Sequence, residues 1–385
     1  MADSDGFYRP RRSGARLFVE PQRLEAAARN ALSSEVYDFV AGGAGTGRTA
    51  RANLDAFERW RIVPRMLCEV DGRDIGTSLF GRPLPTPLLL APIGAQGVVH
   101  PDGELATARA AAATGVPMLL SASSSCDIEA VAVANGSGVR WFQLYWSNDD
   151  EHTVSVLRRA RNAGFTALVV TIDNPIIGWR PLDLDSGYSP FARGLGMQVY
   201  FSDPVFRSRL DKAPEEDVPA AVAHWRRIFD GRNHSWAELS FLRQHWDGPI
   251  VLKGIQHPDD ALRALDHGAD GIVVSNHGGR QVDGAVASLD ALPGVTDAVA
   301  GRIPVLFDSG VRTGSDVIKA LALGADAVLV GRPYIWGLAC GGESGVEQVI
   351  RALLQDLDIT LALAGRRDVD TLDRGLLRRE GQGVS

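Results

Sequence analysis

From about residue 87 onward, short apolar runs rich in β-branched residues alternate with stretches of helical periodicity. This alternation is typical of repeated strand–helix units, which build a parallel sheet. The runs, in chain order, are PLLLAPIG ending at Gly94, VPMLLSAS ending at Ser123, VRWFQLYW ending at Trp146, ALVVTID ending at Asp173, PIVLKGI ending at Ile255, GIVVSN ending at Asn276, PVLFDSG ending at Gly310 and AVLVGRP ending at Pro333. Eight strands with intervening helices favour a closed (β/α)8 TIM barrel over an open doubly wound sheet.

The segments around these units suggest one domain with two additions. Residues 20–80 precede the first strand and look helical, and a polar insertion at 181–235 follows strand four. We expect the insertion to form a loop and short helices near the active face. The barrel then spans 87–366 within a single domain at 20–380, and residues 1–19 form a flexible tail.

Composition and charge exclude several classes of partner. No apolar run approaches the roughly 20 residues that span a bilayer, and the charged start MADSDGFYRPRRSGAR resembles neither a signal peptide nor an anchor. The net charge of −7 argues against a nucleic-acid partner. Cys68, Cys126 and Cys340 show no metal-ligand or disulfide spacing, so we expect no metal site and a cytoplasmic location.

Polar side chains gather where the predicted strands end, and this is the end of a (β/α)8 barrel that carries function. After the last two strands, glycines beside Arg312 and Arg332 indicate a phosphate site, although glycines that only form turns and arginines that pair with acids are the alternative. No GxGxxG motif follows the first strand, which counts against a Rossmann dinucleotide domain.

The segment SNHGGRQVD, at 275–283, is the most informative one for catalysis. It places His277, a potential base, three residues before Arg280, a cation that can hold a carboxylate through two hydrogen bonds. A structural histidine is the alternative. Asp173 and Lys253 at other strand ends favour the catalytic interpretation.

From about Glu20 to about Arg366 the chain resembles the FMN-dependent 2-hydroxy-acid oxidases and dehydrogenases, a family that includes glycolate oxidase, lactate oxidase, mandelate dehydrogenase and lactate 2-monooxygenase. The motifs that carry the resemblance are YDFVAGGAG, FQLYW, TIDNP, LKGIQHPDDA, SNHGGRQ, PVLFDSGVRTGSDV and LVGRPYIWG. GWRPLDL, KGIQHPDDA and FDSG look most like the lactate 2-monooxygenase branch. The resemblance implies bound FMN and oxidation of a 2-hydroxy acid to the 2-keto acid, with oxygen as the expected acceptor.

The resemblance also implies a role for each site residue. His277 looks like the catalytic base, Asp173 like the carboxylate that stabilises its imidazolium, and Lys253 like the cation beside flavin N1 and the C2 carbonyl. The substrate contacts implied are Arg180 and Arg280 on the carboxylate and a hydrogen bond from Tyr145. The other flavin contacts implied are Pro92, Ile93, Gly94, Ser121, Gln143, Thr171 and Ser275, and the phosphate contacts are Asp308, Ser309, Gly310, Arg312, Gly331 and Arg332. Whether the base takes the hydroxyl proton or the α-proton stays open.

The chain departs from the family pattern around the substrate. Phe39 stands where the family usually has a tyrosine that bonds the carboxylate, and losing such a bond costs about 1.5–3 kcal/mol unless another group replaces it. Ser123 is small for its position. With Phe39 and Ile177 it suggests a roomier or more apolar pocket, suited to an aryl or long aliphatic hydroxy acid, although a Phe39 that only packs in a lid helix is the alternative. Gly94 replaces the alanine of many oxidases.

Alternative functions follow from the same resemblance. One is oxidative decarboxylation of the lactate 2-monooxygenase type, and another is a dehydrogenase that passes electrons to a quinone or protein. A flavin-binding barrel that has lost catalysis, or a phosphate-binding isomerase without flavin, belongs to a different class. The resemblance further implies a homotetramer whose small-molecule partners are a 2-hydroxy carboxylate and oxygen.

Overall fold

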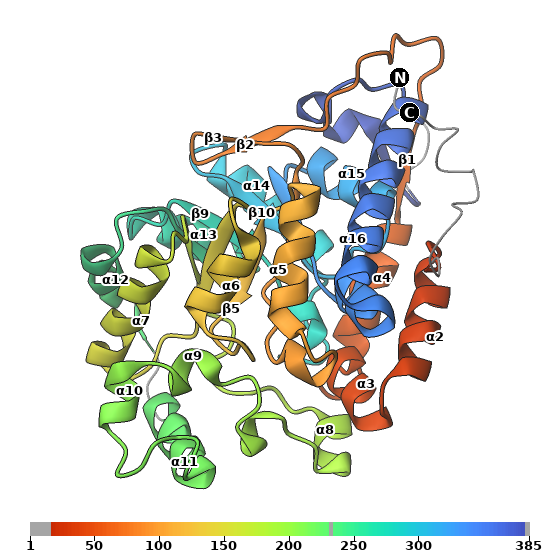
Figure 1. Cartoon of the computed structure of the whole chain (residues 1–385). Coiled ribbons are helices and arrows are strands. Elements are labelled where there is room, and N and C mark those ends of the chain that lie inside the picture. The colour runs from red at the N-terminus through yellow and green to blue at the C-terminus, as the bar shows by residue number, and fades with distance from the viewer. Residues whose placement is uncertain (1–16, 231–233, 382–385) are drawn as a thin grey trace.

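The computed structural model describes residues 17–230 and 234–381, and in these ranges eight parallel strands close into a barrel (Figure 1). The strands are β4 (Leu88–Leu90), β5 (Met118–Ser121), β6 (Arg140–Leu144), β7 (Leu168–Thr171), β8 (Ile250–Ile255), β9 (Gly271–Val274), β10 (Val305–Phe307) and β11 (Ala327–Val330). The predicted (β/α)8 barrel is confirmed. Only β8 runs to its predicted end, because the other apolar runs continue into loops at the barrel rim.

The alternation of side chains along each strand decides what lies inside the barrel. The inward-facing apolar residues form one buried cluster that includes Leu89, Leu119, Trp141, Val169, Val251, Val273, Leu306 and Leu329. Because side chains alternate between the two faces of a strand, the residue two positions later faces inward again. At the carboxyl ends those residues are Ala91, Ser121, Gln143, Thr171, Lys253, Ser275, Asp308 and Gly331, most of which are polar. The barrel therefore changes from an apolar interior to a polar rim within one layer of side chains.

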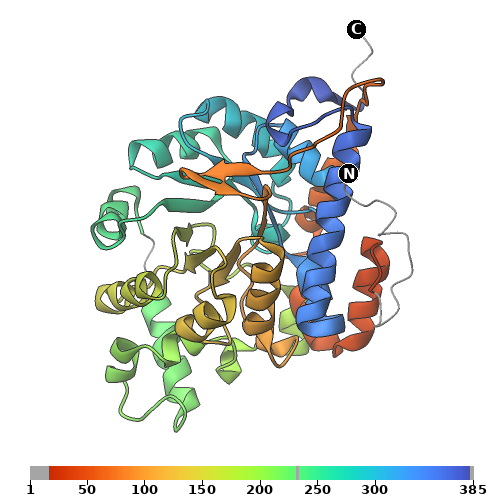
Figure 2. The same cartoon turned by 45° about the horizontal axis from the view of Figure 1, so that its top comes forward.

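Helices surround the barrel and bury its outward-facing residues. They are α5 (Gly103–Thr114), α6 (Ile128–Asn135), α7 (Asp150–Asn162), α12 (Leu239–His245), α13 (Pro258–Asp266), α14 (Ser288–Val299), α15 (Gly314–Ala322) and α16 (Arg332–Leu363). Helix α13 begins with Pro258, as its sequence predicts. Figure 2 shows the long α16 running beside α5, with α2 (Pro21–Ala31) on its other side.

The segment before the barrel is helical only in its first part. Helices α2, α3 (Ser34–Ala41) and α4 (Arg48–Glu58) are followed by β1 (Trp60–Ile62), which pairs with β12 (Leu377–Arg379). Strands β2 (Thr77–Leu79) and β3 (Arg82–Leu84) form a hairpin. The expectation that 20–80 is helical throughout was therefore wrong beyond Glu58. The hairpin alternates so that Leu79 and Leu84 join the inner barrel cluster and fill its amino end.

The structure describes the predicted tail, residues 1–19, only from Leu17 onward. Residues 1–16 of that tail lie outside the described residues. The Leu17 backbone N–H donates to Gln348 Oε1 at 3.2 Å, so the chain contacts helix α16 from this residue onward. No helix in the described part of the chain is long and apolar enough to cross a membrane.

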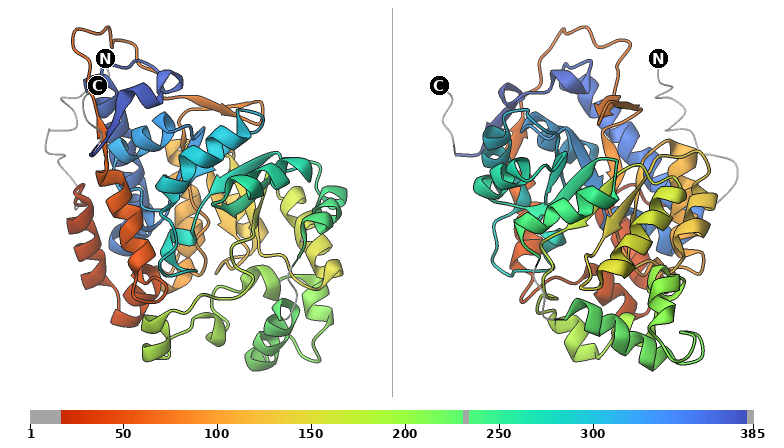
Figure 3. Two further views of the ribbon diagram at one scale, coloured as in Figure 1. Left: turned by 180° about the vertical axis from the view of Figure 1, so that it is seen from behind. Right: turned by 90° about the vertical axis from the view of Figure 1, so that its left-hand side faces the viewer.

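The insertion forms the short helices that the sequence predicts. They are α8 (Pro181–Ser186), α9 (Gln198–Phe201), α10 (Pro204–Ser208) and α11 (Val218–Phe229), and 3-10 turns occur at Phe191–Arg193 and Trp236–Glu238. In Figures 1 and 3 these helices lie at the end of the barrel opposite the β2–β3 hairpin. The insertion thus stands over the polar rim.

Candidate active site

A cavity of about 660 Å³ opens at the polar rim, between the strand ends, helix α3 and the insertion. The predicted site residues that line it are Phe39, Pro92, Ile93, Gly94, Ser121, Ser123, Tyr145, Thr171, Ile177, Arg180, Lys253, His277, Arg280, Asp308, Ser309, Gly310, Arg312, Gly331 and Arg332. The other three, Gln143, Asp173 and Ser275, are hydrogen-bonded to residues in that set. The structure therefore brings together every residue that the sequence singled out.

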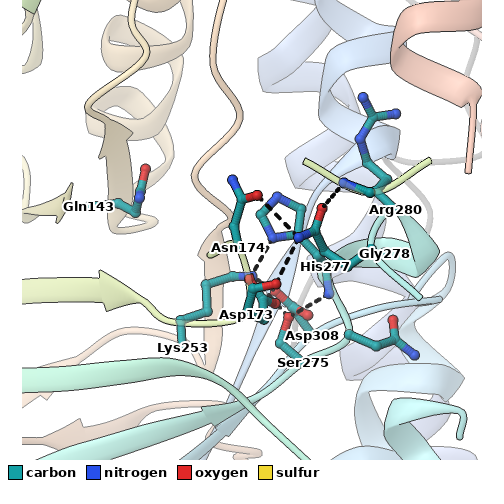
Figure 4. Close-up of polar contacts among 12 residues, drawn as sticks. Gln143, Asp173, Asn174, Lys253, Ser275, His277, Gly278, Arg280 and Asp308 are labelled. Carbon is teal, nitrogen blue, oxygen red and sulfur yellow. Dashed lines mark hydrogen bonds and ion pairs between the residues drawn. The ribbon is translucent and has the colours of Figure 1, made fainter. Parts of the chain in front are cut away.

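His277 and Asp173 form a partly buried pair at the cavity. His277 Nδ1 lies 2.9 Å from Asp173 Oδ1 (Figure 4). Burial lowers the pKa of His277, and the Asp173 carboxylate opposes this without reversing it. Burial raises the pKa of Asp173, but His277 and Lys253 outweigh it and the net shift is downward. The pair therefore holds a neutral imidazole next to a carboxylate at neutral pH.

The backbone holds His277 in an unusual conformation. Its φ of 59° lies in the left-handed region, which a non-glycine residue adopts at some cost. The His277 N–H donates to Ser275 Oγ at 3.0 Å, and the next N–H, of Gly278, donates to Ser309 Oγ at 3.0 Å. No partner in the described ranges bonds Nε2 of His277, so this nitrogen is available to a ligand in the cavity.

Lys253 supplies a buried positive charge at the centre of the rim. Its Nζ lies 3.1 Å from Asp308 Oδ2 and donates to Ser275 Oγ at 2.9 Å (Figure 4). Burial opposes the charge of Lys253, but Asp308 and Asp173 outweigh it and raise its pKa. The ammonium group is therefore permanently charged at physiological pH.

Arg312 and Arg332 form the first of two arginine pairs at the cavity. Burial lowers the pKa of both side chains, that of Arg332 to about 10, and the charge of Arg312 adds to the effect on Arg332. Beside them the backbone of Gly310 has a φ of +93°, and a Cβ there would lie 2.5 Å from the Asn53 carbonyl oxygen. Neither arginine forms an ion pair with a described residue. This pair needs an anion from outside the chain.

Arg180 and Arg280 form the second pair, next to His277. Arg280 Nη1 donates to the carbonyls of Phe39 at 2.8 Å and Gly42 at 2.7 Å. Burial and the charge of Arg180 lower the pKa of Arg280 well below its usual range. In the described ranges neither side chain forms an ion pair with an acid. A second anion is therefore required, on the His277 side of the cavity.

Gln281 is a site residue that the sequence interpretation did not assign. Its Nε2 donates to Asp173 O at 2.7 Å and also to Asn174 Oδ1 and Ile176 O. Its Oε1 accepts from Gly178 N–H and from Arg180 Nη2 at 3.3 Å. Gln281 thus ties the loop after β7 to the His277 loop. The sequence shows that Gln281 belongs to SNHGGRQVD, but it does not show which groups the side-chain amide contacts.

Asn53 and Asn276 form a second contact that the sequence does not reveal. Their side-chain amides exchange hydrogen bonds of 2.8 and 2.7 Å, and both residues are buried. Asn276 Oδ1 also accepts from the Gly279 N–H at 3.1 Å. Helix α4 is therefore joined to the loop that carries His277. The two residues are far apart in sequence, so only the fold brings them together.

Comparison with known proteins identifies the family. A family model described as FMN-dependent dehydrogenase matches residues 28–379, which include the whole barrel and most of its flanking elements. The chain belongs to this family. The FMN-dependent alpha-hydroxy acid dehydrogenase qulF of Penicillium citrinum is 53% identical over 364 residues, which cover 94% of this chain and 90% of that protein. The L-lactate oxidase of Lysinibacillus sphaericus is 44% identical over 362 residues, 94% of this chain and 93% of that protein.

A solved structure agrees with these relatives. The crystal structure of mandelate oxidase superimposes with a TM-score of 0.84 at 40% identity, covering 96% of this chain and all of that one. As an FMN-dependent dehydrogenase, the chain is an oxidoreductase that uses FMN and acts on the CH–OH group of 2-hydroxy acids. The finer resemblance to the lactate 2-monooxygenase branch stays a prediction.

The residues of this FMN-dependent dehydrogenase fit its cofactor. Ser121 Oγ donates to Gln143 Oε1 at 2.9 Å, which leaves Gln143 Nε2 as a buried donor without a partner among the described residues. Such a donor is costly unless a ligand accepts its hydrogen bond. Arg312 and Arg332 likewise lack an acid among the described residues and line the cavity together with Gly310. These features suit the polar ring edge and the phosphate of FMN.

Proposed function

We propose that this cavity oxidises a 2-hydroxy acid to the 2-keto acid with oxygen as the acceptor. The observation that carries the proposal is the two arginine pairs, Arg312 with Arg332 and Arg180 with Arg280, which line one cavity without acidic partners among the described residues. Unpaired buried charges are unfavourable, so each pair is a binding site for an anion. One anion is the FMN phosphate and the other is the substrate carboxylate.

His277 is the catalytic base in this proposal. A base must be unprotonated, and the burial that lowers the pKa of His277 keeps its imidazole neutral. When Nε2 takes a proton from the substrate, the Asp173 carboxylate at 2.9 Å from Nδ1 stabilises the imidazolium that forms. Tyr145 lines the cavity beside this pair and donates a hydrogen bond to the substrate.

Lys253 provides the electrostatic part of catalysis. Bound FMN supplies the acceptor for the two electrons of the oxidation. The cation at Lys253 Nζ is fixed by Asp308 and Ser275 before the reaction begins, so it stabilises developing negative charge without rearrangement. We assign the remaining cofactor contacts to Pro92, Ile93, Gly94, Ser121, Gln143, Thr171, Ser275, Asp308, Ser309, Gly310, Arg312, Gly331 and Arg332.

We propose that the substrate side of the cavity is apolar in character. Phe39, Ser123 and Ile177 all line it, and the charge of Arg280 lies 5.5 Å from the centre of the Phe39 ring. Phe39 therefore offers a cation–π contact and no hydroxyl. We propose that Arg180 and Arg280 alone hold the carboxylate while Phe39, Ser123 and Ile177 accommodate a side chain larger than methyl.

The test is anaerobic mixing of the purified flavoprotein with a panel of 2-hydroxy acids. Bleaching of the flavin absorbance is the expected result, and Arg280→Met should weaken the apparent affinity for the acid by at least about tenfold, since a charged hydrogen bond contributes about 1.5–3 kcal/mol. A flavin that no 2-hydroxy acid bleaches would overturn the proposal and favour a barrel that has lost catalysis.

A second candidate is oxidative decarboxylation, favoured by the GWRPLDL and FDSG motifs and by Gly94 in place of alanine. Product analysis in air distinguishes the two. The oxidase releases the 2-keto acid and hydrogen peroxide, whereas the monooxygenase releases an acid one carbon shorter, with CO2. Slow flavin reoxidation in air would instead indicate a quinone or protein acceptor.

We also propose a homotetramer located in the cytoplasm, built from one domain at 20–380. Exposed apolar side chains near the cavity, including Ile176, Trp179 and Leu184, support an interface between copies. The three cysteines are unpaired, which suits a reducing compartment. Light scattering of the purified protein tests the oligomeric state, and a monomeric mass would contradict it.

A further inference from the structure

The insertion contributes a wall of aromatic side chains to the cavity. Phe191 comes from its first 3-10 turn, Tyr200 from α9, and Trp225 and Phe229 from α11, and all of them line the cavity with the catalytic residues. The insertion was expected to be polar, but it brings these aromatic side chains to the cavity. Its aromatic residues are widely spaced in the sequence, and only the fold gathers them.

The wall is continuous and begins at the substrate's carboxylate site. Phe39, beside Arg280, lies 6.1 Å from Phe191 between ring centres, and Phe191 lies 5.9 Å from Trp225. Trp225 then lies 5.5 Å from Phe229. These distances are those of favourable aromatic pairs. A molecule held at Arg280 would therefore have the aromatic wall along one side.

Three of the four rings that the insertion contributes are only partly covered by protein. Tyr200 is almost fully buried, with 2% of its surface exposed, so it serves to anchor the wall. Phe191, Trp225 and Phe229 are only partly buried, although they pack against the hydrophobic core. Because these three also line the cavity, it is there that ring surface stays open to a ligand.

Small residues pack closely at the strand ends that line this cavity. Gly94 and Ser123 line the same cavity, and a Cβ on Gly94 would lie 2.7 Å from the Ser123 carbonyl oxygen. The backbone at these positions is packed too closely for larger groups to be added without movement. The chain thus combines small residues at the strand ends with rings on the insertion.

We propose that the aromatic wall is an aryl subsite, so the preferred substrates are 2-hydroxy acids whose side chain ends in an aromatic ring. The inference rests on the proposed function, because it takes the carboxylate to be at Arg180 and Arg280. Aromatic surfaces favour another ring over an aliphatic chain of equal size, by about three- to tenfold in affinity for each good pair. Phe191, Trp225 and Phe229 determine the preference.

The experiment compares three acids in anaerobic flavin reduction: lactate, 2-hydroxyoctanoate and 3-phenyllactate. We expect the aryl acid to bind about tenfold more tightly than the aliphatic acid of similar size. Trp225→Leu and Phe229→Leu should each lower the ratio of kred/Kd for phenyllactate over lactate by about tenfold. Trp236→Leu is the matched control, because Trp236 stacks on His267 and does not line the cavity.

A binding measurement separates the subsite from the reaction. Titration with 3-phenylpropionate, which lacks the hydroxyl and cannot be oxidised, perturbs the flavin spectrum when it binds. If no acid reduces the flavin, the proposed function fails, and the aryl subsite is still tested by this titration in Trp225→Leu against Trp236→Leu. Equal affinity for 3-phenylpropionate and octanoate, or equal losses for aryl and aliphatic ligands in Trp225→Leu, would overturn the aryl subsite.

Discussion

The charge on His277 is set by two opposing effects that meet at one imidazole. Burial favours the neutral ring and therefore lowers the pKa, while the Asp173 carboxylate at 2.9 Å favours the charged ring. Burial is the larger effect. The imidazole of His277 is thus neutral and able to accept a proton at neutral pH. The Asp173 carboxylate stabilises it most strongly after the proton has been transferred to it.

This balance predicts the pH dependence of the reductive half-reaction. Activity requires neutral His277, so it is present above the pKa of that residue and is lost as the pH falls through it, with a midpoint below the ordinary value of about 6.5. Asp173→Asn removes the effect that raises this pKa. We expect the acid midpoint to move further down while kred falls about a hundredfold or more, both measured by anaerobic stopped flow. A midpoint that moves up would contradict the assignment.

Replacing Gln281 is expected to lower the affinity for the substrate, because Gln281 contacts Arg180. Gln281→Met removes the acceptor of Arg180 Nη2 and the three donor contacts to the loop after β7. We expect the Kd of a hydroxy acid to rise about tenfold, and the preference for an acid over its uncharged amide to shrink. Gln281→Glu keeps the acceptor but adds a negative charge beside Arg180, so it should also shrink that preference. A uniform loss for acid and amide would indicate a purely structural role.

A tyrosine at position 39 is expected to tighten the binding of the substrate. Phe39→Tyr restores the hydroxyl that the family usually has at this position, next to Arg280. We expect the Kd of lactate to fall about tenfold, because a hydrogen bond to a charged group contributes about 1.5–3 kcal/mol. Stopped-flow titration measures it. An unchanged Kd would mean that the side chain at position 39 does not reach the carboxylate.

At the scale of elements, helix α4 fixes the loop that carries His277. Asn53→Ala would leave Asn276 without its buried amide partner and Ser288 N–H without its acceptor. We expect the free energy of unfolding to fall by about 1–3 kcal/mol, measured in urea. Asn148→Ala is the control, because Asn148 donates to Asp230 O at an exposed position. Equal losses in both variants would contradict the special role of Asn53.

The sequence could predict the elements better than their contacts. Eight apolar runs predict the barrel, and their parity already determines that Ser121, Gln143 and Lys253 face the axis. The β2–β3 hairpin was missed because three-residue strands leave almost no periodic signal. Gln281, Asn53 and the aromatic wall were missed for another reason. Their importance depends on which distant residue they meet, and a single sequence does not contain that information.

At the scale of the whole molecule, FMN should contribute strongly to stability. Without the cofactor, Arg312 and Arg332 lack an anion and Gln143 Nε2 lacks an acceptor. Removing FMN should lower the melting temperature, and adding it back at a hundred times its Kd should restore about 2.7 kcal/mol. Inorganic phosphate should recover part of this effect, and Arg312→Met should abolish the recovery. Calorimetry measures both, and a phosphate response that survives in Arg312→Met would contradict the assigned phosphate site.

Leu79 and Leu84 of the β2–β3 hairpin close the amino end of the barrel. The interior of the barrel is itself filled by apolar side chains, so ligands can enter and leave only at the rim. FMN and the hydroxy acid share one cavity at the open rim. We therefore expect FMN to bind before the acid, and a bound acid to slow the release of FMN. The packed interior that the hairpin completes thus leaves a single face of the barrel for both ligands.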